Sequence, residues 1–126
     1  MAKQIYVDLP IKNLNRSVAF FSQLGFKFNP QFTDDNSYVM LLVESFFKTF
    51  TPNPICDAHK STEVRVCLST ESRGKVDEMV KKAVAAGATT PNQAQDHGFM
   101  YQHGFQDLDG HLWEIMYMDP SAAGRS

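Results

Sequence analysis

The chain has 126 residues, of which 43% are hydrophobic and 21% are charged, and its formal net charge is −2. This length and composition predict one globular domain with its own core. The balanced charge and the absence of Lys/Arg runs argue against nucleic acid or an anionic membrane as a partner, and no apolar stretch approaches the roughly 18 residues of a membrane span. We therefore expect a small-molecule ligand.

The ends of the chain and its cysteines suggest the compartment. The first residues lead directly into a strand pattern without the features of a signal peptide, so a cytoplasmic protein is expected. Cys56 lies in a Pro-rich loop and Cys67 in an apolar strand, and neither has the spacing of a metal knuckle. Two free thiols in a reducing compartment are predicted.

A strand followed by a helix opens the chain. The strand is predicted from the alternation of Ile5, Val7, Leu9 and Ile11. The helix begins after Asn13, a candidate N-cap, and ends before a Gly at its C-terminus; its apolar stripe is Leu14, Val18, Phe21 and Leu24. Further along, residues 38–43 read as a second strand and residues 45–50 as a short helix rich in Phe. Its aromatic side chains are expected to cover a cleft or a partner subunit.

The same order of elements returns in the second half. A strand is predicted from Val64, Val66 and Leu68, and a helix follows from the candidate N-cap Ser72 to Gly87. Its buried stripe is Val76, Met79, Val80, Ala83 and Val84. Two strands are then expected over residues 99–106 and 111–118.

The two halves differ in length. Glu114 lies 27 residues after Gly87, whereas its apparent counterpart Leu41 lies only 16 residues after Gly25. About one strand and its turn are missing from the first half. Two explanations stay open: the first module is short, or a hairpin near residues 36–37 is absent from the sequence.

Glu114 is the unusual residue of the last strand. The Asp109-Gly110 pair predicts a tight turn between two antiparallel strands. On the second of these strands, Leu112, Glu114 and Met116 share one face because side chains alternate. A carboxylate between two apolar side chains lies either at a sheet edge or in a cavity where a polar group meets it.

These residues resemble a known family, the vicinal-oxygen-chelate superfamily of glyoxalase I, bleomycin and fosfomycin resistance proteins and extradiol dioxygenases. The resemblance is carried by the repeated module and by three motifs: Asn13-Leu14-x-x-Ser17-x-x-Phe20-Phe21, Leu24-Gly25-Phe26 and Asp107-Leu108-Asp109-Gly110. A bacterial subgroup of predicted lactoylglutathione-lyase-like proteins is similar at Phe28-Asn29-Pro30-Gln31-Phe32, Glu63-Val64 and at residues 95–101.

The resemblance implies an α+β fold of two β-α-β-β-β modules, the first short by one strand, that form a curled mixed sheet with a cleft. Module one would span about 1–55, module two about 60–119, and residues 120–126 a short tail, all in a single domain. A homodimer is also expected from the resemblance.

The family's metal chemistry depends on four ligand positions. Carried over, they fall on Tyr6, Leu41, Glu63 and Glu114, so only the second module offers carboxylates. A catalytic cation usually needs three protein ligands. Asp8, two residues after Tyr6 on the same strand face, could complete a set with Glu63 and Glu114, or could simply face solvent. A divalent metal is therefore one possibility and no cofactor the other.

A loop and a strand supply the other site candidates. His97 and Tyr101 flank Gly98, and the subgroup motif favours a role for them beside Glu114 in catalysis, although a solvated loop histidine is the simpler alternative. The remaining histidines have no partner at ligand spacing and are expected at the surface: His59, His103 and His111. We further expect Glu63 and Glu114 to face each other across the cleft.

Two functions remain open at this stage. The first is a metal-dependent lyase or isomerase acting on a small oxygenated substrate, with a glutamate moving a proton. The second is a metal-free protein that binds or sequesters a small molecule, as antibiotic-binding members of the superfamily do. Tyr6 and Leu41 weaken classical glyoxalase I activity, and the chain offers no basic anchor for glutathione.

Overall fold

The computed structural model describes residues 6–26 and 38–119. Within it the chain divides into two compact units, Met1–Asp57 and Ala58–Ser126, which are described separately. In neither described range is there a helix long and apolar enough to cross a membrane. Residues 36–37, where a hairpin could be absent from the sequence, lie outside the described residues, as do the motif at 28–32 and the tail at 120–126. The single domain stays a prediction.

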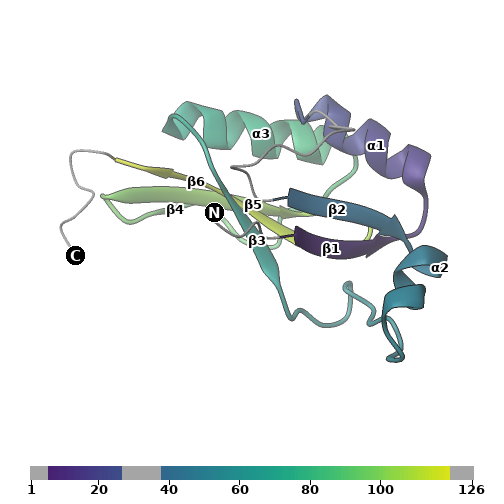
Figure 1. The fold of residues 1–126 in the computed structure, drawn as a ribbon. Helices are drawn as coiled ribbons and strands as arrows, with labels where there is room; N and C mark the ends of the chain where they lie inside the picture. Colours follow the sequence, from purple (N-terminus) through teal and green to yellow (C-terminus); the bar gives the residue numbers. More distant parts are fainter. Residues whose placement is uncertain (1–5, 27–37, 120–126) are drawn as a thin grey trace, which may run out of the picture. The chain divides into compact units, whose positions relative to one another are not determined.

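The first unit is built on a parallel strand pair (Figure 1). Its elements are β1 (Tyr6–Ile11), α1 (Leu14–Gln23), β2 (Tyr38–Val43), α2 (Glu44–Phe47) and the 3-10 helix η1 (Lys48–Phe50). The predicted N-cap of α1 is confirmed, because the Asn13 side chain accepts a hydrogen bond from the Arg16 amide at 3.0 Å. The core of this unit consists of Leu9, Ile11, Phe20, Phe21, Leu24 and Leu42.

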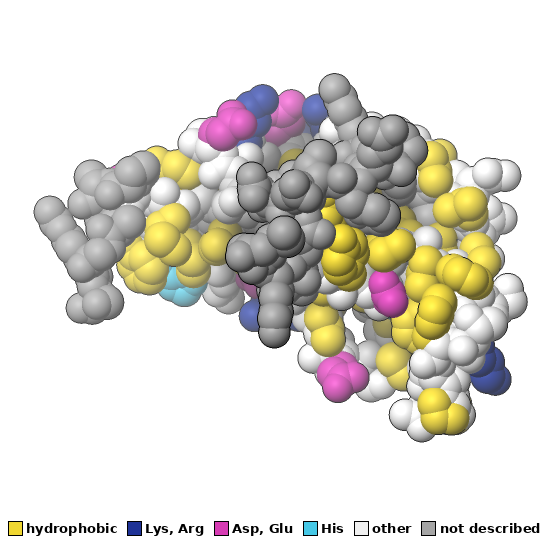
Figure 2. All heavy atoms as spheres, viewed as in Figure 1, with side chains coloured by type: hydrophobic (Ala, Val, Ile, Leu, Met, Phe, Trp, Pro, Cys, Tyr) yellow, Lys and Arg dark blue, Asp and Glu magenta, His cyan; other side chains and the backbone are white. Residues whose placement is uncertain are grey.

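The short helix after β2 leaves aromatic rings at the surface. The single helix expected over residues 45–50 is instead an α-helical turn followed by a 3-10 turn. Phe46 and Phe50 are 52% and 66% exposed, and their rings pack edge to face with centroids 5.1 Å apart. Figure 2 shows hydrophobic side chains gathered at the surface over this end of the unit.

The second unit is a four-stranded sheet covered on one face by a helix (Figure 1). Its elements are β3 (Arg65–Ser69), α3 (Arg73–Ala85), β4 (Gln95–Asp96), β5 (Met100–Gln106) and β6 (Leu112–Met118). The strand order is β3-β6-β5-β4; β3 runs parallel to β6, and the other pairs are antiparallel. The core between helix and sheet consists of Val76, Val80, Ala83, Phe105, Trp113 and Ile115.

Helix α3 begins as the sequence predicts. The side chain of its N-cap, Ser72, accepts a hydrogen bond from the Lys75 amide at 3.1 Å, and Gly87 beyond its end has a φ of +113°. The predicted free thiols are also confirmed, since Cys56 and Cys67 form no disulfide. The mixed α+β class predicted from the sequence is likewise confirmed.

The turn between β5 and β6 is wider than a two-residue hairpin. The Asp107 amide donates to the His111 carbonyl at 2.9 Å, so three residues form the loop. Only Gly110 has a positive φ, +91°, which fits a three-residue loop that ends in a left-handed residue. A Cβ at Gly110 would also lie 2.5 Å from the backbone nitrogen of His59. Glycine is therefore required at this position by both conformation and space.

Candidate functional site

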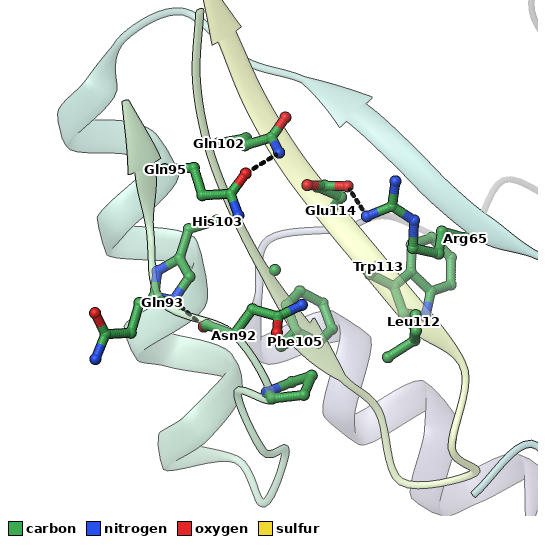
Figure 3. Close-up of a pocket in the computed structure, with 12 residues that line it drawn as sticks. Arg65, Asn92, Gln93, Gln95, Gln102, His103, Phe105, Leu112, Trp113 and Glu114 are labelled. Carbon is green, nitrogen blue, oxygen red and sulfur yellow. Dashed lines mark hydrogen bonds and ion pairs between the residues drawn. The ribbon is translucent and has the colours of Figure 1, made fainter. Parts of the chain in front are cut away.

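A pocket lies on the sheet of the second unit, and every residue that lines it belongs to that unit (Figure 3). In β6, Trp113 and Ile115 are buried under α3, so the alternate residues Leu112 and Glu114 point to the opposite face. The pocket volume is about 80 Å³, enough for a group of a few heavy atoms. It is suited to hold the polar end of a ligand rather than a whole cofactor.

The central charge pair of the pocket joins β3 to β6. Arg65 Nη1 donates to Glu114 Oε2 at 2.6 Å. The Glu114 side chain is 13% exposed and that of Arg65 is 58% exposed, so the carboxylate is the more enclosed partner. The Glu114 carboxylate, which is unusual between two apolar residues of its strand, therefore forms an ion pair with the Arg65 guanidinium.

Gly104 opens the space beside Glu114. The two residues are paired across β5 and β6. A Cβ at Gly104 would lie 2.7 Å from the carbonyl oxygen of Trp113, closer than real Cβ atoms approach backbone. A glycine at this point in the strand lets the two backbones come close and leaves no side chain over Glu114.

Amide side chains form the opposite wall. Gln102 Nε2 donates to Gln95 Oε1 at 3.0 Å, which links β5 to β4. Next to this pair, a ring nitrogen of His103 lies 3.2 Å from the Asn92 carbonyl. In Figure 3 the Glu114 oxygen that is not bound to Arg65 points toward the glutamine pair. The pocket thus places a carboxylate acceptor opposite amide groups.

Cys67 lies next to this charge pair on β3, level with Glu114. Partial desolvation and the neighbouring Glu114 carboxylate raise the pKa of the Cys67 thiol, and Arg65 opposes the rise. The thiol therefore stays protonated near neutral pH and is a poor nucleophile.

A buried carboxylate holds the turn that carries β6. Asp107 is 5% exposed. Its Oδ1 accepts from the Asp109 and His111 amides, each at 2.9 Å, and its Oδ2 accepts from Trp113 Nε1 at 2.8 Å. Burial raises the pKa of this carboxyl, while the hydrogen bonds from Trp113 and His111 lower it. The role of Asp107 is to fix the start of β6, two residues ahead of Glu114.

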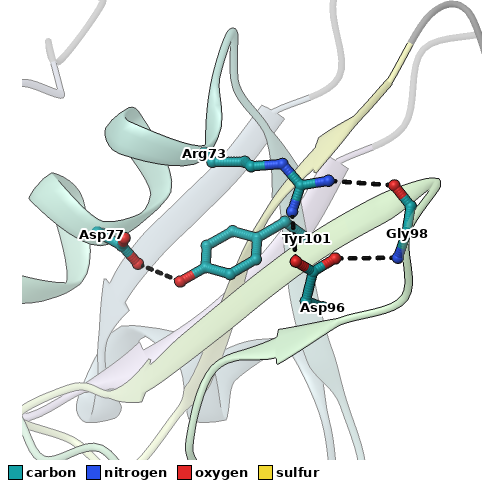
Figure 4. Close-up of polar contacts among 5 residues, drawn as sticks. All are labelled: Arg73, Asp77, Asp96, Gly98 and Tyr101. Carbon is teal, nitrogen blue, oxygen red and sulfur yellow. Dashed lines mark hydrogen bonds and ion pairs between the residues drawn. The ribbon is translucent and has the colours of Figure 1, made fainter.

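Tyr101 lies with α3 rather than with Glu114 (Figure 4). Its hydroxyl donates to Asp77 Oδ1 at 2.6 Å, and the Arg73 guanidinium carbon lies 5.5 Å from its ring centroid. The hydrogen bond to Asp77 raises the pKa of Tyr101. Tyr101 is therefore held against the helix, and the structure does not bring it together with Glu114.

His97 sits at the tip of the β4–β5 hairpin. The loop is held by Asp96, which pairs with Arg73 at 2.8 Å and accepts from the Gly98 amide at 2.9 Å (Figure 4). The Arg73 guanidinium also donates to the Gly98 carbonyl at 3.1 Å. His97 itself is exposed, with its ring centroid 6.3 Å from that of Phe99. The catalytic roles of His97 and Tyr101 stay predictions.

Glu63 and Asp8 are both exposed, and they belong to different units. Glu63 is exposed and precedes β3 by two residues, whereas the residue of β3 level with Glu114 is Cys67. In the first unit, Asp8 is an exposed residue of β1, level with Met40. No three His, Cys, Asp or Glu side chains in the described ranges are grouped as a metal ion requires. Neither unit by itself groups donors that fit a catalytic cation among its described residues, and metal ligation by Glu63, Glu114 and Asp8 stays a prediction.

The first unit presents apolar groups where the family has ligands. Tyr6 stacks on Tyr38, with ring centroids 5.3 Å apart and planes 14° from parallel. Leu41 is paired with Leu9 in the parallel register. Both positions therefore contribute to packing within this unit.

The chain is similar to known proteins in sequence and in fold. A family model described as bleomycin resistance protein-like N-terminal matches residues 3–43, which include β1, α1 and β2. The chain has the vicinal-oxygen-chelate fold. The resemblance predicted from the repeated module is thereby confirmed.

Three solved structures show how widely the fold is shared. The hypothetical protein SA1046 from S. aureus has 23% identity and a TM-score of 0.79, over 93% of this chain and 95% of that one. A glyoxalase-related enzyme from Fulvimarina pelagi has 18% identity and a TM-score of 0.75, over 93% and 88%. The fosfomycin resistance protein FosX from Listeria monocytogenes has 17% identity and a TM-score of 0.63, over 96% and 97%. A comparison with curated proteins gives no match.

Proposed function

We propose that this protein binds a small organic molecule in the pocket of its second unit, without a metal ion. The observation that carries the proposal is the ion pair between Arg65 and Glu114. A carboxylate that already receives a guanidinium N–H at 2.6 Å has less need of a cation. The pocket also contains apolar side chains, including Leu112, and small-molecule sites combine apolar lining with a few polar groups that orient the ligand.

The names of structural neighbours agree with a binding role. FosX is named as a resistance protein, and the matching family model is named after bleomycin resistance. The pocket of this chain holds amides and a charge pair, which can hold a ligand by hydrogen bonds. Binding or sequestration is the function that we favour over catalysis.

The test is a nuclear magnetic resonance titration of EDTA-treated, ¹⁵N-labelled protein with a set of small amides, acids and amines. We expect saturable shifts of the amide signals of Arg65, Gly104 and Glu114. A Glu78→Gln variant is the matched control, because Glu78 is exposed on α3 and does not line the pocket, and it should bind equally well. Shifts that appear only after a metal ion is added would contradict the proposal.

A metal-dependent lyase or isomerase is the second candidate. It is favoured by the place of Glu114 on the last strand, on the face away from α3, where the family's last ligand lies. The assay follows lactoylglutathione formation from methylglyoxal and glutathione after nickel, cobalt, manganese or zinc is added to stripped protein. We expect no turnover above the background, because Tyr6 and Leu41 cannot replace two ligands. Robust turnover that is lost in Glu114→Gln would establish the enzyme instead.

A homodimer is also proposed. The exposed, mutually packed rings of Phe46 and Phe50 support it, because such aromatic pairs are common in protein interfaces. Sedimentation velocity should give the mass of a dimer, and Phe46→Ser with Phe50→Ser should shift it toward the monomer. A monomeric wild-type protein at micromolar concentration would contradict this.

A further inference from the structure

We infer that the pocket selects a neutral ligand group that both donates and accepts hydrogen bonds, such as a primary carboxamide, over a carboxylate or a cation. This inference rests on the proposed binding function and names the chemical class of its ligand. It is drawn from the arrangement of Arg65, Glu114, Gln95 and Gln102 (Figure 3).

The charge of the pocket is already balanced. Arg65 and Glu114 neutralise each other at 2.6 Å, and their side chains are the charged groups among the lining residues. An incoming carboxylate would be attracted by the guanidinium of Arg65 but repelled by Glu114. An incoming cation would be attracted by Glu114 but repelled by Arg65. A neutral group leaves the existing pair intact, so it binds without the cost of separating two opposite charges.

The hydrogen-bonding groups left over are complementary to an amide. Glu114 uses one carboxylate oxygen for Arg65, and its other oxygen has no hydrogen bond within the described part of the chain. Gln95 accepts through its oxygen from Gln102, which leaves its own N–H groups as donors. A carboxamide can donate its N–H to Glu114 while its carbonyl accepts from Gln95.

The space matches a group of this size. Because Gly104 has no side chain, nothing from the paired position of β5 covers Glu114. A volume of about 80 Å³ accommodates a planar group of three heavy atoms with part of its attached ring. Leu112 supplies an apolar contact for that ring, and the rest of the ligand extends out of the pocket.

Three probes of nearly equal shape test the inference: benzamide, benzoate and benzamidine, which are neutral, anionic and cationic at pH 7. Each is titrated into EDTA-treated, ¹⁵N-labelled protein while the amide signals of Gly104 and Glu114 and the side-chain amide of Gln95 are followed. We expect benzamide to have a dissociation constant at least about tenfold lower than the other two.

Two variants should reorder the probes. Glu114→Gln leaves Arg65 as the uncompensated charge, so benzoate should gain about tenfold and become the tightest probe. Arg65→Gln leaves Glu114 uncompensated, so benzamidine should become the tightest. The amide spectrum of each variant, compared with that of the wild type, verifies the fold.

The outcomes separate this inference from the proposal beneath it. If benzoate or benzamidine binds the wild-type pocket as tightly as benzamide, the preference for a neutral group is wrong while binding in the pocket stands. If none of the three shifts the pocket signals and the fold is intact, both the binding function and the inference are overturned. An unchanged probe order in both variants would also contradict the inference.

Discussion

The strand pairs β1–β2 and β3–β6 share one orientation and differ in chemistry. Both are parallel and both follow a strand–helix pattern. In the first pair, the level residues Leu9 and Leu41 are aliphatic, whereas in the second, Cys67 is level with Glu114 and Arg65 reaches that carboxylate. A repeated strand pair therefore does not repeat the site, because the second unit adds the charge pair and the amide side chains of its β4–β5 hairpin.

Loss of the buried Asp107 carboxylate should have the largest effect. Asp107→Ala leaves the Trp113 indole N–H and two backbone amides without their acceptor. We expect a loss of about 3 kcal/mol in the free energy of unfolding, measured by urea titration. Asp107→Asn keeps one acceptor oxygen and should lose less. Equal stability of Asp107→Ala and the wild type would show that this turn does not support the second unit.

A methyl group at Gly104 should have the next largest effect. Gly104→Ala places its Cβ against the Trp113 carbonyl, so we expect a loss of about 2 kcal/mol and weaker ligand binding. Gly74→Ala is the matched control, because a Cβ there meets only Ser72 Oγ at 3.9 Å, and alanine favours a helix by up to about 1 kcal/mol. If Gly104→Ala and Gly74→Ala have the same stability and the same ligand affinity, the close approach of β5 and β6 does not shape the pocket.

The contacts of Asp96 with Arg73 and with the Gly98 amide should make the stability of the β4–β5 hairpin depend on pH, with a small effect. The Gly98 amide and Arg73 lower the pKa of Asp96 below its usual 3.8. The stabilisation of the hairpin is therefore complete above about pH 4 and is lost as the pH falls through the lowered pKa. The protection factor of the Gly98 amide, which is the intrinsic exchange rate divided by the observed rate, should fall over that range in the wild type. In Asp96→Asn the protection factor should be low at every pH, and a pH-dependent fall retained there would exclude Asp96 as its cause.

Much of the fold follows from local patterns in the sequence. Alternation of side chains predicts β1, β3 and β6. The caps Asn13 and Ser72 lie where their side chains can accept hydrogen bonds from N3 amides. These signals act over a few residues and do not need the tertiary structure. The placement of Glu114 away from the core also follows from alternation along one strand.

The partners of the site residues could not be predicted in the same way. Arg65 and Glu114 are 49 residues apart, and only the register of β3 against β6 brings them together. The burial of Asp107 depends on a three-residue loop that the Asp-Gly signal did not specify. Tyr101 is different, because it lies four residues before the buried Phe105 on one strand. That spacing already favoured the face toward the helix.

The most direct test of a metal-independent pocket is a calorimetric titration of nickel, and then zinc, into EDTA-treated protein and into its Glu114→Gln variant. We predict no stoichiometric binding that depends on Glu114, because Arg65 already pairs with one oxygen of its carboxylate and the described residues group no further donors with it. Both proteins should give the same heats. One-to-one binding with a micromolar or lower dissociation constant in the wild type, abolished in Glu114→Gln, would contradict the account and assign Glu114 to a metal.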